Sequence, residues 1–132
     1  MTPSEISEFF ELDAVALAQK IRQNEVTAEA LLNEATRRAK KHNTALNALA
    51  DIDYNAGEKL LAETDRAAAL YGVPTLIKDL GAESVDFHTN SGSQLFSRSK
   101  VSQNSSIFDR MRQAGLVPFG RTTSPEFGVG PV

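Results

Sequence analysis

The chain has 132 residues, of which 41% are hydrophobic and 23% charged, and its formal net charge is -3. These values are typical of a soluble globular domain, and so weak a net charge indicates neither a nucleic-acid partner nor an anionic membrane surface. The sequence contains no cysteine, which excludes disulfides, thiol catalysis and cysteine-ligated zinc sites.

The N-terminus has no basic segment followed by an apolar run, so we expect no signal peptide. No apolar stretch approaches the ~20 residues that a membrane-spanning helix needs. His42 and His88 are far apart and lack a partner at ligand spacing, so neither is expected to bind a metal. We therefore predict a cytoplasmic protein that contacts neither membrane nor nucleic acid and binds no metal or cofactor.

Hydrophobic spacing predicts three helices before residue 71. Asp13 caps the first, which continues to about residue 22, and Thr27 caps the second, which is expected to close at His42-Asn43. Residues 46–49 form a short strand or an extended connection. The third helix is predicted from about Tyr54 to about Leu70.

The second of these helices carries the one basic cluster of the chain. Its residues share the helix with Glu29 and Glu34, so we interpret the cluster as a solvated face rather than a binding surface. The basic residues are Arg37, Arg38, Lys40 and Lys41.

The pattern changes after Gly72, where a strand, a helix and a second strand are predicted. Residues 73–77 are a short apolar run and indicate a buried strand, whereas residues 80–103 are irregular in composition. Asn104 is expected to cap the helix, with Ile107, Phe108 and Met111 on its buried face and Gly115 just beyond its end. Residues 116–119 form the next strand, which we place at an edge or a bulge because Pro118 cannot donate a hydrogen bond.

These elements define an α/β protein. Residues 1–71 form an N-terminal helical layer, and residues 72–132 form one βαβ unit whose strands should be parallel. Two strands alone leave apolar residues without cover, so some should face water and the chain should self-associate through its uncovered sheet. The residues concerned are Val73, Leu76, Ile77, Leu116, Val117 and Phe119.

Five segments in order along the chain resemble motifs of the amidase-signature hydrolases. Gly72–Asp79 reads Gly-Val-Pro-Thr-Leu-Ile-Lys-Asp and is similar to the family's G-V-P-x-x-x-K-D segment. The other segments are similar to the family's helical leader, its Gly-Ser stretch, its L-R-x-A-G helix end and its G-K-T-N-x-P-E-F turn. The leader lies at residues 25–32 and 46–48, the Gly-Ser stretch at 89–93, the helix end at 112–115 and the turn at 120–127. The resemblance implies the start of the amidase-signature mixed-sheet core, incomplete in these residues.

Four positions depart from the family pattern. Arg121 replaces the usual lysine, Thr123 the usual asparagine, Met111 a leucine and Asn104 a capping aspartate. We expect these changes to keep the capping and packing chemistry, although they could alter the geometry of the turn at residues 120–127.

The resemblance implies a Ser–Ser–Lys triad. In it one serine attacks the amide carbonyl, a second serine on a cis peptide bond relays the proton, and a buried lysine is the final base. A lysine can take this role when desolvation disfavours its ammonium form. Lys78 follows a short apolar strand, at the edge where α/β sheets present their chemistry, and we predict it as the catalytic lysine. The alternative is an ordinary solvated lysine at a strand end.

The same resemblance places both serines and the oxyanion hole in a glycine- and serine-rich segment that follows all the motifs present here. Ser105 and Ser106 open a helix and are expected to serve its cap, while Ser91 and Ser93 belong to the Gly-Ser stretch. None of the four lies on a glycine-flanked strand-to-helix elbow. We therefore expect the chain to carry only the lysine and to be catalytically incompetent alone.

Two alternatives stay open. One is a stand-alone, non-catalytic α/β domain used for binding or assembly, and the other is a subunit whose second half is on another chain. In a complete enzyme the partner would be a small-molecule amide substrate, whose identity this sequence does not predict.

Overall fold

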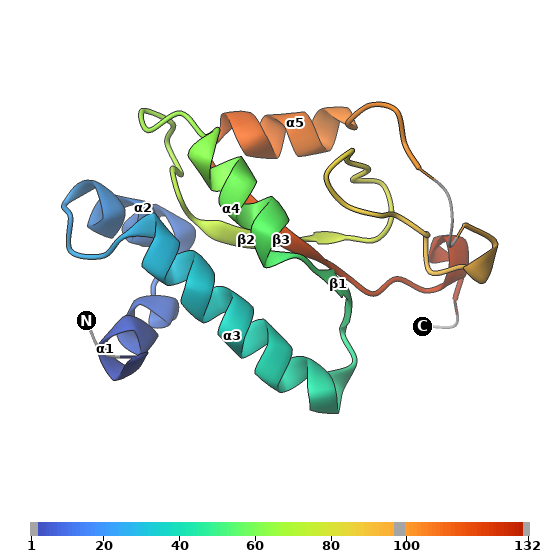
Figure 1. Ribbon diagram of the computed structural model, residues 1–132, viewed down its shortest axis with the longest axis horizontal. Coiled ribbons are helices and arrows are strands. Elements are labelled where there is room, and N and C mark those ends of the chain that lie inside the picture. The colour runs from blue at the N-terminus through green and yellow to red at the C-terminus, as the bar shows by residue number, and fades with distance from the viewer. Residues whose placement is uncertain (1–2, 97–99, 131–132) are drawn as a thin grey trace.

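The computed structural model describes residues 3–96 and 100–130, and their architecture is mixed α/β, as predicted (Figure 1). The helices are α1 (Pro3–Glu8), α2 (Ala14–Arg22), α3 (Ala28–Leu46), α4 (Tyr54–Ala62) and α5 (Ser106–Gln113). The strands are β1 (Leu49–Ile52), β2 (Pro74–Lys78) and β3 (Val117–Thr122). Short 3-10 helices add single turns at Phe9–Glu11, Gln94–Phe96 and Glu126–Gly128.

The strands form one sheet in the order β1-β3-β2. β2 and β3 are parallel, which confirms the predicted pairing, and β1 joins β3 in antiparallel orientation. The expectation that β3 lies at an edge is wrong, since β3 is central among the described strands. The other expectation, a bulge, is confirmed, because the register of β2 against β3 shifts between Thr75 and Ile77, beside Pro118. This irregularity accommodates Pro118, which has no amide hydrogen to donate.

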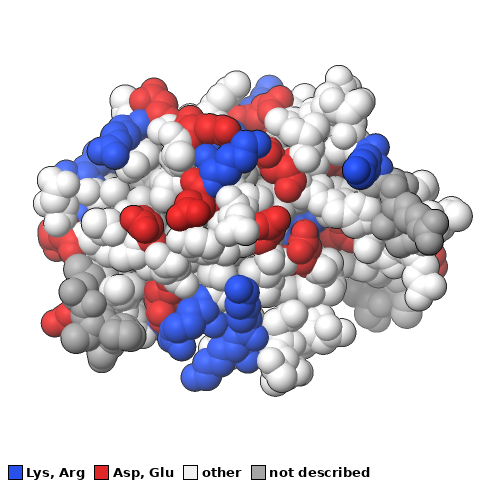
Figure 2. Space-filling model, in the orientation of Figure 1, with Lys and Arg blue, Asp and Glu red and all other residues white. Residues whose placement is uncertain are grey.

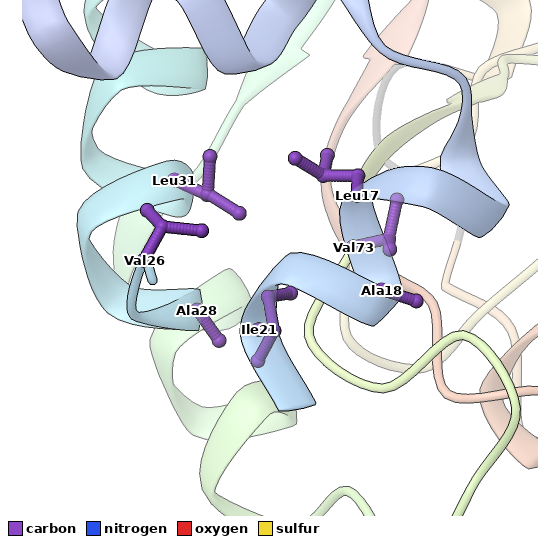
Figure 3. Close-up of a cluster of buried hydrophobic side chains, with 7 residues drawn as sticks. All are labelled: Leu17, Ala18, Ile21, Val26, Ala28, Leu31 and Val73. Carbon is purple, nitrogen blue, oxygen red and sulfur yellow. The ribbon is translucent and has the colours of Figure 1, made fainter. Parts of the chain in front are cut away.

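Helices and sheet bury three hydrophobic clusters. In the first, side chains of α2 and α3 converge with Val73, at the entrance to β2 (Figure 3). The second joins α4, α5 and Ile77, and the third packs α3 against Val117 and Phe119 of β3. Most of the apolar strand residues that were expected to face water are therefore buried by the helices. Of these residues only Leu76 and Leu116 are partly exposed.

Two helix boundaries differ from the sequence prediction. α3 continues to Leu46 and ends at Asn47, whose φ of 48° is left-handed, while the Asn43 side chain accepts from the Leu49 amide at 2.8 Å. α4 ends at Ala62 rather than near Leu70. Thr64 donates its hydroxyl hydrogen to the Leu60 carbonyl at 2.6 Å, and irregular turns follow.

The start of α5 also differs. Ser105, and not Asn104, is the N-cap, and its hydroxyl accepts from the Phe108 amide at 3.4 Å. The Asn104 side chain is engaged elsewhere, because it accepts from the Val85 amide and donates to Asp109. Ile107, which was expected to be buried, is 50% exposed. One helix, α1, was not predicted.

The surface mixes both signs of charge. Figure 2 shows acidic residues interspersed with basic ones, and a group of basic side chains lies over α3. The basic cluster of α3 is not simply a solvated face, because Glu34 is only 5% exposed beneath it and binds both Arg37 and Arg38. Within the described ranges, the helices are too short or too polar to cross a membrane.

Candidate active site

Lys78 is the last residue of β2 and lies opposite Thr122 of β3. Its side chain is exposed to solvent, so the burial that the resemblance implies for a catalytic lysine is not found among the described residues. Its carbonyl accepts a hydrogen bond from Arg121 Nη1 at 2.8 Å. The next amide, that of Asp79, donates to the Thr122 carbonyl at 3.0 Å. The carboxyl ends of the two parallel strands therefore meet here, where α/β sheets commonly hold their sites.

Asp79 organises the loop that follows. Its carboxylate is 2% exposed, and it accepts from the Asn90 amide at 3.0 Å and from the Gly92 amide at 3.1 Å. Backbone amides are good partners for a buried carboxylate, because each satisfies part of its charge. Sequence reasoning assigned no role to this residue, although an acidic residue directly after a buried strand was a usable signal.

The loop at residues 89–93 packs against the turn at residues 123–128. Ser93 is 4% exposed and donates its hydroxyl hydrogen to Glu126 Oε1 at 2.6 Å. The Phe127 amide donates to the Ser91 carbonyl at 2.9 Å. Gly92 has a φ of +69°, and a Cβ there would lie 2.3 Å from the Ser124 carbonyl oxygen, so only glycine fits between the two segments.

Arg121 lies beneath this strand end. The turn expected from residue 120 begins later, because Gly120, Arg121 and Thr122 belong to β3. The Arg121 side chain is fully buried and donates from Nη2 to the Ala82 carbonyl at 2.7 Å, in addition to its bond to Lys78. Burial lowers the pKa of its guanidinium, and the nearby acidic residues oppose that shift, Asp79 most strongly.

An exposed apolar cluster borders the same loops. The rings of Phe96 and Phe127 meet edge to face with centroids 5.6 Å apart, and Leu95 and Val129 beside them in sequence are 78% and 82% exposed. Among the residues with described positions, no group of three or more histidine or acidic side chains is arranged to hold a metal ion.

The structure thus brings three of the sequence motifs together: Gly72–Asp79, the Gly-Ser stretch and the segment at residues 120–127. The motif at residues 112–115 lies at the opposite end of the strands. There the Ala114 carbonyl accepts from the Leu70 amide at 2.7 Å and the Gly115 carbonyl from the Gly72 amide at 3.0 Å. Its role is to close the connection into β2 rather than to build the candidate site.

The fold is mixed α/β, and comparison with known proteins identifies the family to which it belongs. The family model described as Amidase matches residues 30–132. The lipoamidase of Enterococcus faecalis is 31% identical over 124 residues, which are 92% of this chain and 17% of that protein. The putative amidase AmiC of Mycobacterium bovis is 34% identical over 123 residues, or 92% of this chain and 26% of that protein.

Solved structures show the same fold. The 6-aminohexanoate cyclic dimer hydrolase complexed with substrate superposes with a TM-score of 0.81 at 25% identity, over 88% of this chain and 24% of that one. The chain belongs to the amidase family. It spans only 17% and 26% of the lengths of the two curated relatives above.

Proposed function

We propose that these residues are the N-terminal part of an amide hydrolase and that Lys78 is the base of its Ser–Ser–Lys triad. The observation that supports this most is the position of Lys78 at the carboxyl end of β2, beside the loops at residues 89–93 and 123–128. Three of the family motifs meet at this point of the molecule.

The chemistry assigned to Lys78 is proton transfer. Its amine would accept the proton of a relay serine, which takes the proton of the nucleophilic serine as that oxygen bonds to the amide carbonyl carbon. Both serines, and the donors that stabilise the tetrahedral oxyanion, would come from a segment beyond these residues. A lysine alone has no nucleophile to activate, so the 132 residues by themselves should not hydrolyse amides.

A hybrid enzyme tests the proposal. Residues 1–132 would replace the matching segment of the 6-aminohexanoate cyclic dimer hydrolase, and hydrolysis of the cyclic dimer would be followed. We expect activity from the hybrid and none from the 132-residue chain or from the hybrid with Lys78→Ala. The matched control is Lys41→Ala, which removes an exposed lysine of α3 and should leave the rate unchanged.

Two results would contradict the proposal. A soluble, folded hybrid without activity would favour a stand-alone binding or assembly domain. Full activity of the Lys78→Ala hybrid would remove Lys78 from the reaction while leaving the family membership intact.

A further inference from the structure

Arg121 is the largest fully buried side chain among the described residues, and its guanidinium is a cationic group. Taking a guanidinium out of water is costly unless hydrogen bonds satisfy it, and buried arginines are usually paired with a carboxylate. Among the described residues Arg121 forms no ion pair, and its Nε has no hydrogen-bond partner. Its two bonds of 2.8 and 2.7 Å go to backbone carbonyls instead.

Those two carbonyls belong to Lys78 and Ala82, which enclose the turn between β2 and the following loop. The planar guanidinium donates to both carbonyls at once and so fixes the two acceptors relative to each other. The backbone of Lys78 is thereby held from β3, one residue before Asp79 binds the amides of Asn90 and Gly92.

No carboxylate among the described residues is hydrogen-bonded to Arg121. Asp79, Glu83 and Asp51 lie close enough to Arg121 to oppose the effect of burial on its pKa. Their negative charges stabilise the buried guanidinium electrostatically without a direct hydrogen bond. Two of its nitrogen atoms therefore stay bonded to the carbonyls of Lys78 and Ala82.

We infer that Arg121 is a positioning residue for Lys78: its buried guanidinium clamps the carbonyls of Lys78 and Ala82 and so fixes the backbone from which the Lys78 side chain projects. Arg121 touches no reacting atom in this role. The inference rests on the proposed function for its effect on the reaction, but the clamp itself is a property of the chain and can be tested without activity.

The structure offers a matched control in Arg112. This arginine is partly buried and also donates to two backbone carbonyls, those of Leu116 and Leu60, but it lies at the other end of β3. Arg112→Met therefore removes a comparable clamp without touching the end of β2. Arg121→Lys is the conservative variant, because it keeps a buried cation with donors.

The first measurement is hydrogen exchange of the 132-residue chain, read by mass spectrometry on peptides covering residues 79–92. The amides of Asp79, Asn90 and Gly92 are all hydrogen-bonded there. Arg121→Met should accelerate their exchange by about tenfold or more, since bonds to charged groups are among the stronger ones. Arg121→Lys should restore much of the protection, and Arg112→Met should leave it unchanged.

The second measurement is kinetic, in the hybrid enzyme. Arg121→Met should lower kcat by about 10–100-fold with little change in KM. This is the effect expected when a residue that positions a reacting group, without touching the substrate, is lost. Arg121→Lys should recover most of that loss. Arg112→Met should leave kcat of the folded fraction unchanged.

The exchange and kinetic measurements together show which part of the proposal is wrong if one of them gives an unexpected result. Unchanged exchange in residues 79–92 with Arg121→Met would overturn the clamp. Faster exchange with unchanged kcat would overturn its link to Lys78 and leave the proposed function standing. An inactive hybrid would overturn the proposed function, while the exchange result would still decide the clamp.

Discussion

Glu34 is a buried carboxylate held by two arginines of its own helix. Arg37 Nε donates to it at 2.7 Å and Arg38 Nε at 2.9 Å, and Arg38 also bonds to Ser7 and lies over the Phe10 ring at 4.3 Å. The hydrogen bond from Arg37 is the main cause that lowers the pKa of Glu34 from 4.5 to about 2, against the opposing effect of burial. This network ties α3 to the first residues of the chain.

The lowered pKa predicts how stability depends on pH. A carboxyl group whose pKa falls on folding stabilises the protein above its unfolded pKa, and that contribution is lost as the pH falls from 4.5 towards 2. Glu34→Gln should lower the free energy of unfolding at pH 7 by roughly 1–3 kcal/mol and flatten its dependence on pH in that window. Urea unfolding followed by circular dichroism at pH 7, 4 and 2 measures both effects.

Glu29→Gln is the control for this prediction, since Glu29 is exposed on the same helix. It should leave the curve close to that of the native chain. If the Glu34→Gln variant lost stability below pH 4.5 as steeply as the native chain, the assigned role of Glu34 would be wrong.

The sequence does not reveal this network because the hydrophobic pattern gives no reason for burying Glu34. Arg38, which binds Glu34, also contacts Ser7 and Phe10, which α1 and the following turn bring to α3 from a distant part of the chain. The same holds for Arg121: at its position the family pattern predicts a cation, but only the pairing of β3 with β2 shows which carbonyls it binds. The position of Lys78 at the end of a strand could be predicted because its motif and its strand are local.

At the scale of elements, local signals located the helix starts better than the ends. Asp13 and Thr27 cap α2 and α3 as predicted, since each side chain accepts from an amide three residues later. The end of α4 was missed because the alanines that follow favour a helix, whereas the Leu60 carbonyl accepts from Arg112 and the Leu70 amide donates to the Ala114 carbonyl. Tertiary contacts therefore overrode propensity at this boundary.

The cap of α5 gives a test at the same scale. Ser105→Ala should destabilise the protein by about 1 kcal/mol, because the Phe108 amide loses its acceptor and Phe108 anchors the cluster around Phe87. Ser106→Ala, at the exposed first helical position, should change stability by less than about 0.5 kcal/mol. Thermal unfolding of both variants checks the difference, and equal losses would show that Ser105 is not the energetic cap.

For the whole molecule, the described sheet leaves the outer edge of β2 unpaired. Beside it an apolar groove of about 410 Å³ lies between α3 and the sheet, lined in part by Phe10, Ala39, Leu76 and Phe119. An unpaired edge beside an apolar surface favours pairing with another chain. We therefore propose that the isolated chain self-associates through β2, even though most of its sheet residues are buried.

Sedimentation velocity tests this association. The native chain should form dimers or larger species, and Thr75→Lys, which places a charge on the β2 edge, should shift it towards the monomer. Thr44→Lys adds the same charge to an exposed position of α3 and should change nothing. A monodisperse native monomer with a cooperative thermal transition would refute the proposal and favour a stand-alone domain.

We propose that Lys78 accepts a proton in amide hydrolysis, and the Lys78→Arg hybrid tests this role most directly. Arginine keeps the positive charge and the length of the side chain, but its guanidinium does not give up its proton near neutral pH. We predict that kcat of the Lys78→Arg hybrid falls to the background of the Lys78→Ala hybrid, with fold and substrate binding retained. A Lys78→Arg hybrid that keeps most of its kcat would contradict the account, because a permanent cation cannot be the base.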